Sequence, residues 1–121
     1  MWPVVGEKPT AAWVLSLIGG ILGFISSLIA ALGGTAAIAA TPMPSWLAGV
    51  GVAVCYWFVI AHLIIIIGAL KIKSGEPKAV KTGGTIVLIF SILGGLNILS
   101  LIGGILALTW KPTEATTVTT E

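Results

Sequence analysis

A few polar side chains lie inside long apolar stretches of the sequence, and their chemistry needs explaining first. They are His62, Cys55, Tyr56 and Asn97. The stretches that hold them contain no Asp, Glu, Lys or Arg. Catalysis normally needs titratable groups that converge in one pocket, and ion-coupled transporters usually depend on an ionisable residue within the membrane. The sequence therefore predicts no catalytic residues and argues against an autonomous pump.

His62 is the one candidate for a cofactor site, because a polar residue in an apolar span is a functional hypothesis by default. Its imidazole could bind haem or a metal, or relay a proton. The alternative is a neutral imidazole that hydrogen-bonds to a neighbouring helix, for instance to Asn97, Ser91 or a backbone carbonyl. Cys55 cannot share a metal with His62, because the helical rise would separate them by about 10 Å. We predict a structural role for His62 and no bound metal or cofactor, with lipid contacts instead.

Small residues spaced about four apart form a second pattern. Such residues let helices in lipid approach closely, so they predict helix-packing faces. These faces could pack within the chain or against another subunit, and their presence on both the first and the last apolar tracts favours assembly. The predicted positions are Gly19, Gly23, Ser27 and Ala31 in the first tract and Gly95, Gly103 and Ala107 in the last.

The composition indicates the class of protein that contains these residues. Of the 121 residues, 57% are apolar and 8% are charged, and the mean hydropathy is +1.14. No residue between Lys8 and Lys71, or between Lys81 and Lys111, is charged at neutral pH. A water-soluble fold could not solvate such tracts. We therefore predict an all-α integral membrane protein that forms one domain over residues 1–121. The scattered lysines and the absence of Arg argue against nucleic-acid binding.

Three apolar tracts match the roughly 20 helical residues that a bilayer requires. They predict transmembrane helices over residues 10–32, 46–70 and 85–108. The last tract contains Gly94, Gly95 and Asn97 near its centre, residues typical of a turn between helices. The alternative is therefore four helices, with a short hairpin that turns between Gly94 and Asn97.

Charge sets the predicted orientation in the cell membrane. The loop at residues 71–81 carries four lysines and one glutamate, whereas residues 33–45 carry no charge. The positive-inside rule places the lysine loop, and with it the N-terminus, in the cytoplasm. The Thr-rich segment at residues 113–121 is too short and polar to form a core, and we expect a mobile tail.

The octapeptide LSLIGGIL occurs twice, at residues 15–22 and 99–106. The flanks of the two copies do not match, so a simple duplication is not indicated. We interpret the octapeptide as a helix-packing unit. In a three-helix protein the copies would lie at different depths, whereas in a four-helix protein they would lie antiparallel near the same face.

Three features together resemble a known type of protein. Lys8, Pro9 and Thr10 precede a Gly-rich tract, a lysine-bearing loop follows at residues 71–81, and residues 101–108 lead into Trp110, Lys111 and Pro112. This combination resembles short, uncharacterised, Gly-rich multi-pass membrane proteins of prokaryotes, especially archaea. The resemblance implies four helices and no activity or site residues.

These observations favour a non-catalytic structural or accessory subunit of a larger membrane complex, such as a respiratory, oxidase or monooxygenase assembly. Its partners would be other integral membrane subunits, further copies of itself and lipid. One alternative is a homo-oligomeric pore or a small-solute transport element. Another is a membrane electron carrier or enzyme that depends on His62.

Overall fold

The chain folds into helices joined by short turns. The computed structural model describes residues 9–95 and 97–111. Within these residues there are four helices and no strands, as the predicted all-α class requires. The expectations for the N-terminus and for the tail at residues 113–121 fall outside the described residues. The helices are α1 (Thr10–Ala40), α2 (Ser45–Lys73), α3 (Pro77–Leu93) and α4 (Ile98–Thr109).

The first two helices are longer than the sequence patterns predicted. Helix α1 begins after Pro9, as expected, but continues beyond Leu32 through Gly33 and Gly34 to Ala40. The residues after the glycine pair are mostly alanine, the strongest helix former, and they outweigh two helix-weakening glycines. Both α1 and α2 are long and apolar enough to cross a membrane.

Local capping explains the turn between α2 and α3. Ser74 Oγ donates a hydrogen bond to the carbonyl of Lys71 at 2.7 Å, and Gly75 takes a positive φ of 75°, which glycine adopts without strain. The Glu76 carboxylate then accepts a bond from the backbone N–H of Lys78 at 3.1 Å, and Pro77 occupies the first turn of α3. Proline at this position loses no helical hydrogen bond.

The predicted continuous helix over residues 85–108 is wrong. Helix α3 ends at Leu93, and α4 begins at Ile98. Gly95 adopts a φ of 98°, and the Asn97 side chain caps α4 by accepting a bond from the N–H of Ser100 at 3.2 Å. The N–H of Asn97 itself bonds to the carbonyl of Ser91 at 2.8 Å. The apolar tract is therefore interrupted by a complete turn, and the hairpin alternative describes the chain.

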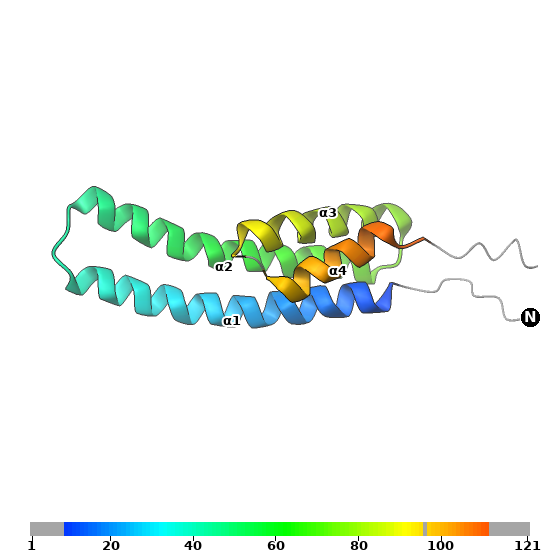
Figure 1. Cartoon of the computed structure of the whole chain (residues 1–121), viewed down its shortest axis with the longest axis horizontal. Coiled ribbons are helices and arrows are strands. Elements are labelled where there is room, and N and C mark those ends of the chain that lie inside the picture. The colour runs from blue at the N-terminus through cyan, green and yellow to red at the C-terminus, as the bar shows by residue number, and fades with distance from the viewer. Residues whose placement is uncertain (1–8, 96, 112–121) are drawn as a thin grey trace, which may run out of the picture.

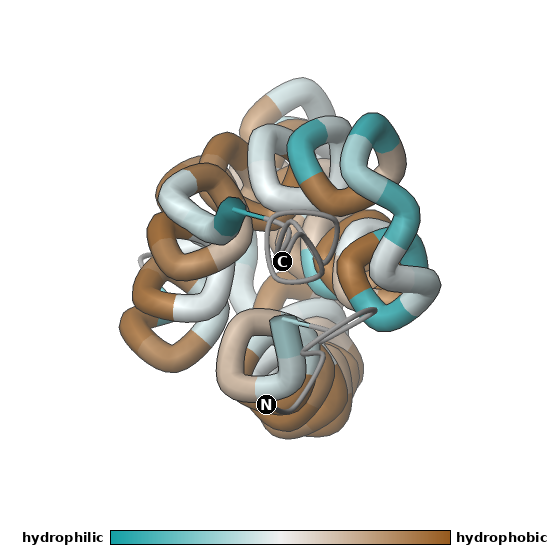
Figure 2. The backbone as a smooth tube through the Cα atoms, turned by 90° about the vertical axis from the view of Figure 1, so that its right-hand side faces the viewer, coloured by the Kyte–Doolittle hydropathy of each residue, from teal (hydrophilic) through white to brown (hydrophobic). Residues whose placement is uncertain are grey.

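A short hairpin packs against one end of a long one (Figure 1). At 1.5 Å per residue, α1 and α2 are about 46 and 44 Å long, whereas α3 and α4 are about 26 and 18 Å long. Helix α3 packs on α2, α4 packs on α1, and the two members of each hairpin pack on each other. Viewed along the long axis, the helices surround a common centre (Figure 2). The molecule thus has a four-helix end and a two-helix end.

The core lies at the four-helix end and is built from small or β-branched side chains. Many large apolar side chains face outward, including Ile29, Leu32 and Ile67 at 66%, 59% and 54% exposure. The interior is therefore less bulky than the exterior, the reverse of a water-soluble bundle. The buried cluster consists of Ala12, Ile65, Ile72, Val80, Val87 and Ala107, with Trp13, Phe90 and Trp110 packed against it.

Candidate functional site

The two copies of LSLIGGIL pack against each other. A Cβ added to Gly19 in α1 would overlap the hydroxyl of Ser100 in α4, and a Cβ added to Gly103 would overlap the hydroxyl of Ser16. The serine of each copy thus sits on the first glycine of the other. Ser100 Oγ also donates a hydrogen bond to the carbonyl of Ser16 at 3.3 Å. The octapeptide is a self-complementary antiparallel contact.

The second glycine of each copy packs within its own hairpin. Gly20 lies against Ile65 and Ile66 of α2, and Gly104 lies against the backbone of Leu88 in α3. One octapeptide therefore serves two contacts, one across the hairpins and one within a hairpin. This arrangement matches the antiparallel placement expected for a four-helix chain, and it makes the repeat a packing unit.

Asn97 fastens the tip of the short hairpin to α1. Its Nδ2 donates to the carbonyl of Gly19 at 2.7 Å, while its Oδ1 caps α4. A Cβ on Gly19 would lie 2.8 Å from this Oδ1, so only glycine leaves room for the amide. The sequence offered two roles for Asn97, a turn residue or a link between helices. The structure gives it both.

His62 lies on α2 beside the hairpin tip and is 5% exposed. Its Nδ1 is 2.7 Å from the carbonyl oxygen of Phe58. A carbonyl can only accept, so Nδ1 carries a proton, and in the tautomer protonated at Nδ1 alone Nε2 is an acceptor. The partner is a backbone carbonyl, one of the kinds predicted for a structural imidazole, but it belongs to the preceding turn of α2 and not to a neighbouring helix. Within the described part of the chain, no hydrogen bond reaches Nε2.

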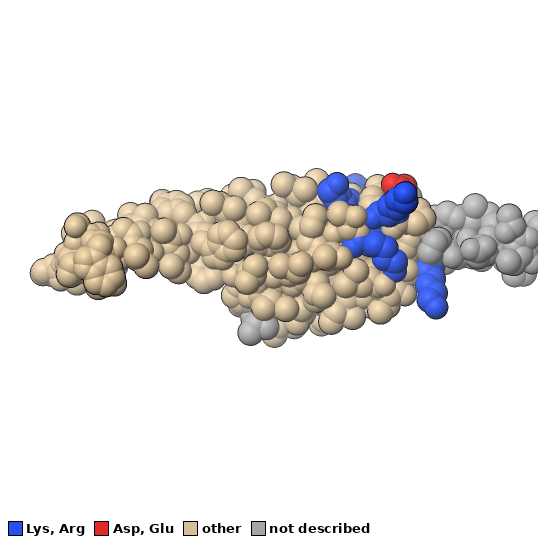
Figure 3. Space-filling view, turned by 90° about the horizontal axis from the view of Figure 1, so that it is seen from above, with Lys and Arg blue, Asp and Glu red and all other residues tan. Residues whose placement is uncertain are grey.

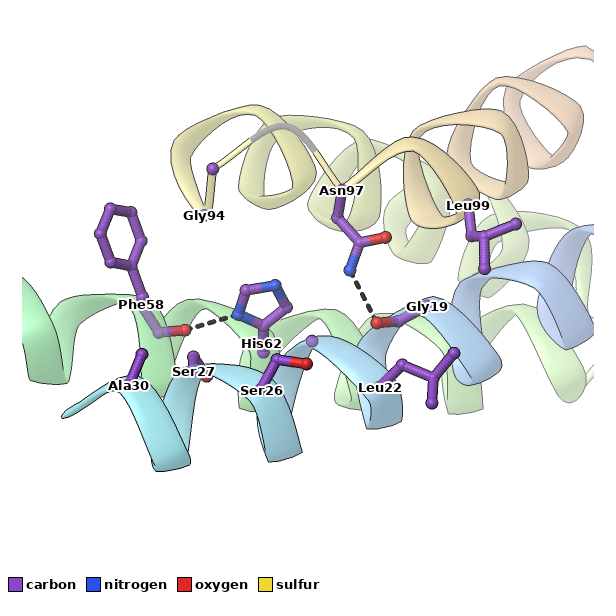
Figure 4. A pocket seen from close by; sticks show the side chains of 12 residues that line it. Gly19, Leu22, Ser26, Ser27, Ala30, Phe58, His62, Gly94, Asn97 and Leu99 are labelled. Atoms are coloured by element: carbon purple, nitrogen blue, oxygen red, sulfur yellow. Dashed lines mark hydrogen bonds between the residues drawn. The ribbon is translucent and has the colours of Figure 1, made fainter. Parts of the chain in front are cut away.

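An open pocket of about 420 Å³ lies where α1, α2 and the hairpin tip meet (Figure 4). It brings together His62 and Asn97, two of the four polar residues singled out from the sequence, and adds the hydroxyls of Ser26 and Ser27; Cys55 and Tyr56 do not line it. Ser27 Oγ donates to the carbonyl of Phe24 at 3.0 Å. The rest of the lining is apolar or glycine: Gly19, Leu22, Gly23, Ala30, Phe58, Gly94, Gly95 and Leu99. The pocket is the candidate functional site.

Gly23 keeps two polar groups of this pocket close together. A Cβ there would overlap the imidazole of His62, including Nε2, and would lie 2.8 Å from Asn97 Nδ2. The two nitrogens are therefore nearer to each other than two hydrogen-bond lengths. One oxygen atom between them could accept from Nδ2 and donate to Nε2.

The other predicted packing residues divide into two groups. Ser27 and Ala31 are buried in the chain together with Gly19, and Gly23 is half-buried against His62 and Asn97, so this face of α1 is occupied by the protein's own helices. Ala107 packs against Gly84. Gly95 does not join the packing face: it is exposed in the turn, where its positive φ is what requires glycine.

The structure brings no metal-binding group together. Among residues 9–95 and 97–111, no three His, Cys, Asp or Glu side chains lie close enough to hold an ion. Cys55 is free and sits near Gly34, toward the two-helix end, away from the predicted packing positions of α4.

Two side chains that the sequence patterns did not single out hold the short hairpin in place. Trp57 Nε1 donates to the carbonyl of Leu93 at 3.1 Å and so satisfies an orphan carbonyl at the end of α3. At the other end, Lys81 Nζ bonds to the carbonyls of Leu108 and Trp110 at the end of α4. Neither contact could be found without knowing that α3 and α4 are separate helices.

Charge gathers at the four-helix end. Residues 71–81, at the end of α2 and the start of α3, hold four lysines and one glutamate. In Figure 3 the charged residues lie toward one end of the molecule, and the opposite end shows none on this face. Lys73 Nζ lies 5.1 Å from the centre of the Trp13 ring, a cation–π distance. The chain matches no protein-family model, no curated protein and no solved structure, so the geometry alone bears on function.

Proposed function

We propose that the chain is a multi-pass protein of the cell membrane, with its four-helix end toward the cytoplasm. The lysines at that end fit the positive-inside rule, and α1 and α2 exceed the roughly 30 Å thickness of a bilayer core. In this placement α3 and α4 form a re-entrant hairpin, because neither of them is long enough to cross alone.

The hairpin tip would lie near the middle of the bilayer. Asn97 bonds to Gly19, which is nine residues into α1 and thus about 14 Å from its start. Irregular backbone at that depth needs internal hydrogen bonds. Asn97, Ser91 and Trp57 supply them at the turn. This match between depth and satisfied backbone groups supports the re-entrant placement.

We infer that the protein serves as a structural subunit that assembles with other membrane helices. The supporting observation is a line of small exposed residues on the two-helix end of α1: Ala30, Gly33, Ala37 and Ala40. Gly23, Ala30 and Ala37 follow at intervals of seven residues and so share one face of α1. The short hairpin contacts this face at Gly23, and beyond that contact the same face is exposed at Ala30 and Ala37. A Cβ added to Gly33 would meet no atom within 4 Å.

A partner helix could extend the bundle along this face. The exposed small residues permit close backbone approach, which is a main source of helix association in lipid. Large apolar side chains in the same place would instead favour lipid contact alone. The occupant expected is a transmembrane helix of another subunit, lying end to end with α4.

Site-specific photocrosslinking in intact membranes tests this function. A benzophenone side chain at Ala37 is expected to give a discrete protein adduct, whereas the same group at Leu32, which is 59% exposed but off the line of small residues, is expected to label lipid. Mass spectrometry of the Ala37 adduct identifies the partner. Equal lipid labelling at both positions would contradict assembly through this face, and an adduct with a second copy would favour a homo-oligomer over an accessory subunit.

A further inference from the structure

The pocket at the hairpin tip contains an unused hydrogen-bond acceptor. His62 is 95% buried, since 5% of it is exposed, and its Nδ1 proton is committed to the Phe58 carbonyl. In the tautomer protonated at Nδ1 alone, Nε2 is an acceptor, and it meets no donor among the described residues. Nε2 keeps some exposed surface, since the fully buried side-chain atoms without a partner in the described residues are Ser16 Oγ and Thr35 Oγ1. A donor inside the pocket can therefore reach it.

A second polar atom points to the form of that donor. Asn97 Nδ2 uses one of its two hydrogens on the Gly19 carbonyl, and the other hydrogen is available to an acceptor. Because Nδ2 and Nε2 flank the same space beside Gly23, a single hydroxyl group can satisfy both. Its hydrogen would go to Nε2 and its oxygen would accept from Nδ2.

The other side chains that line the pocket indicate the chemistry of the rest of the ligand. Leu22, Leu99 and Phe58 are apolar, and the lining contains no charged side chain to balance an ion. Leu22 and Ala30 of α1 and Leu99 of α4 are also exposed, so the pocket opens sideways between α1 and the hairpin. In the membrane placement proposed above, on which this step depends, that opening faces the lipid.

We propose that this pocket binds an apolar, membrane-soluble molecule through one hydroxyl group, which donates to His62 Nε2 and accepts from Asn97 Nδ2. A phenol and an aliphatic alcohol share this chemistry. The imidazole acts as a neutral recognition group, and no bond is made or broken. The role of Gly23 is to keep the hydroxyl position open.

The test uses the full chain, labelled with ¹⁵N in histidine and held in lipid nanodiscs. The chain contains one histidine, so the imidazole signals belong to His62. A long-chain alkylphenol, its O-methyl ether and the matching long-chain alcohol are titrated while the Nε2 resonance is followed. The phenol is expected to move this resonance saturably upfield, as hydrogen bonding to an acceptor nitrogen does. The ether, which cannot donate, should bind about tenfold more weakly. The alcohol tells whether an aromatic ring is also required.

Matched glycine variants locate the binding. Gly23→Ala places a methyl group where the hydroxyl site and the imidazole meet, and it is expected to abolish the shift. Gly49→Ala on α2 fills open space outside the proposed assembly face and should leave the titration unchanged. If Gly23→Ala does not fold, the comparison of phenol with ether on the unaltered chain still decides.

Three results would overturn the proposal. The first is equal binding of phenol and ether. The second is an Nε2 resonance already at the hydrogen-bonded position before any addition, which would indicate water. The third is a loss of binding in Gly49→Ala equal to that in Gly23→Ala. None of these results depends on the photocrosslink at Ala37. A failure of the hydroxyl site therefore leaves the subunit function standing, and the reverse also holds.

Discussion

Glycine has opposite consequences at the two ends of this molecule. At the four-helix end, Gly103 and Gly104 leave no room for a Cβ, because Ser16 and the backbone of Leu88 occupy that space. At the two-helix end, Gly33 and Gly49 meet no atom within 4 Å of that position. The same residue type thus marks a completed contact at Gly103 and Gly104 and an open surface at Gly33 and Gly49. Between α1 and α2 the two-helix end also has completed contacts, since Gly34 meets Cys55 and Gly51 meets Ile38. In an apolar helix, the meaning of a glycine depends on what covers it.

The largest effect is expected from filling a completed contact. Gly104→Leu would push α4 away from the Leu88 backbone, which cannot move aside as a flexible side chain could. Overpacking of this kind should lower the free energy of unfolding by about 3 kcal/mol. Gly49→Leu at the open end should change it by less than about 0.5 kcal/mol. Reversible unfolding in mixed detergent micelles compares the two, and similar losses would remove the contrast between the ends.

The next effect concerns the tip of the short hairpin. Asn97→Ala removes both the cap of α4 and the bond to the Gly19 carbonyl, and it should cost about 2 kcal/mol. Asn97→Ser keeps a capping hydroxyl and should recover about half of that loss. Hydrogen exchange of the α4 amides measures both variants. Unchanged protection of α4 in Asn97→Ala would show that Asn97 does not hold the hairpin.

A smaller effect distinguishes the two copies of the octapeptide. Ser100→Ala loses the bond to the Ser16 carbonyl and should cost about 1 kcal/mol. Ser16 Oγ is buried without a partner in the described structure, so Ser16→Ala should be neutral or slightly stabilising. The same unfolding assay reports both values. A greater loss for Ser16→Ala would mean that its hydroxyl has a partner after all.

The smallest effect lies at the charged end. Lys81→Met keeps the length of the side chain but removes its bonds to the carbonyls at the end of α4. Because Lys81 is exposed, the expected loss is about 0.5 kcal/mol and should appear as faster exchange of the last turn of α4. Lys78→Met, whose ammonium has no such contact among the described residues, is the control. Equal exchange in the two variants would exclude a capping role for Lys81.

The sequence predicted the helices better than their ends. The start of α1 was predicted at residue 10 and that of α2 within one residue, and a proline directly precedes each start. The end of α1 was not predicted, since Gly33 and Gly34 indicate a stop by local rules, yet the following alanines carry the helix on. The turn at Gly95 was predicted only as an alternative. The length of the apolar tract favours one continuous helix, whereas its glycines and Asn97 favour a turn.

The candidate site was predicted in its parts but not in its arrangement. His62 and Asn97 stood out as polar residues in apolar tracts, yet no sequence pattern places the Phe58 carbonyl on one nitrogen and an open space on the other. The reciprocal packing of Ser16 on Gly103 likewise requires α4 to run antiparallel to α1. The direction of α4 depends on the turn at Gly95. Because residues 94–97 could be read either as a turn or as part of one long helix, the arrangement of the site could not be predicted.

The re-entrant hairpin underlies both proposals, and the side of the membrane reached by Lys111 decides whether it exists. Single cysteines at Ser74, Lys111 and Thr41, in a Cys55→Ser background, can be labelled with an impermeant maleimide on sealed vesicles of known orientation. We expect Ser74→Cys and Lys111→Cys to react from the cytoplasmic side and Thr41→Cys from the opposite side. Labelling of Lys111→Cys from the same side as Thr41→Cys would refute the hairpin, because α3 and α4 would then cross the membrane as one span.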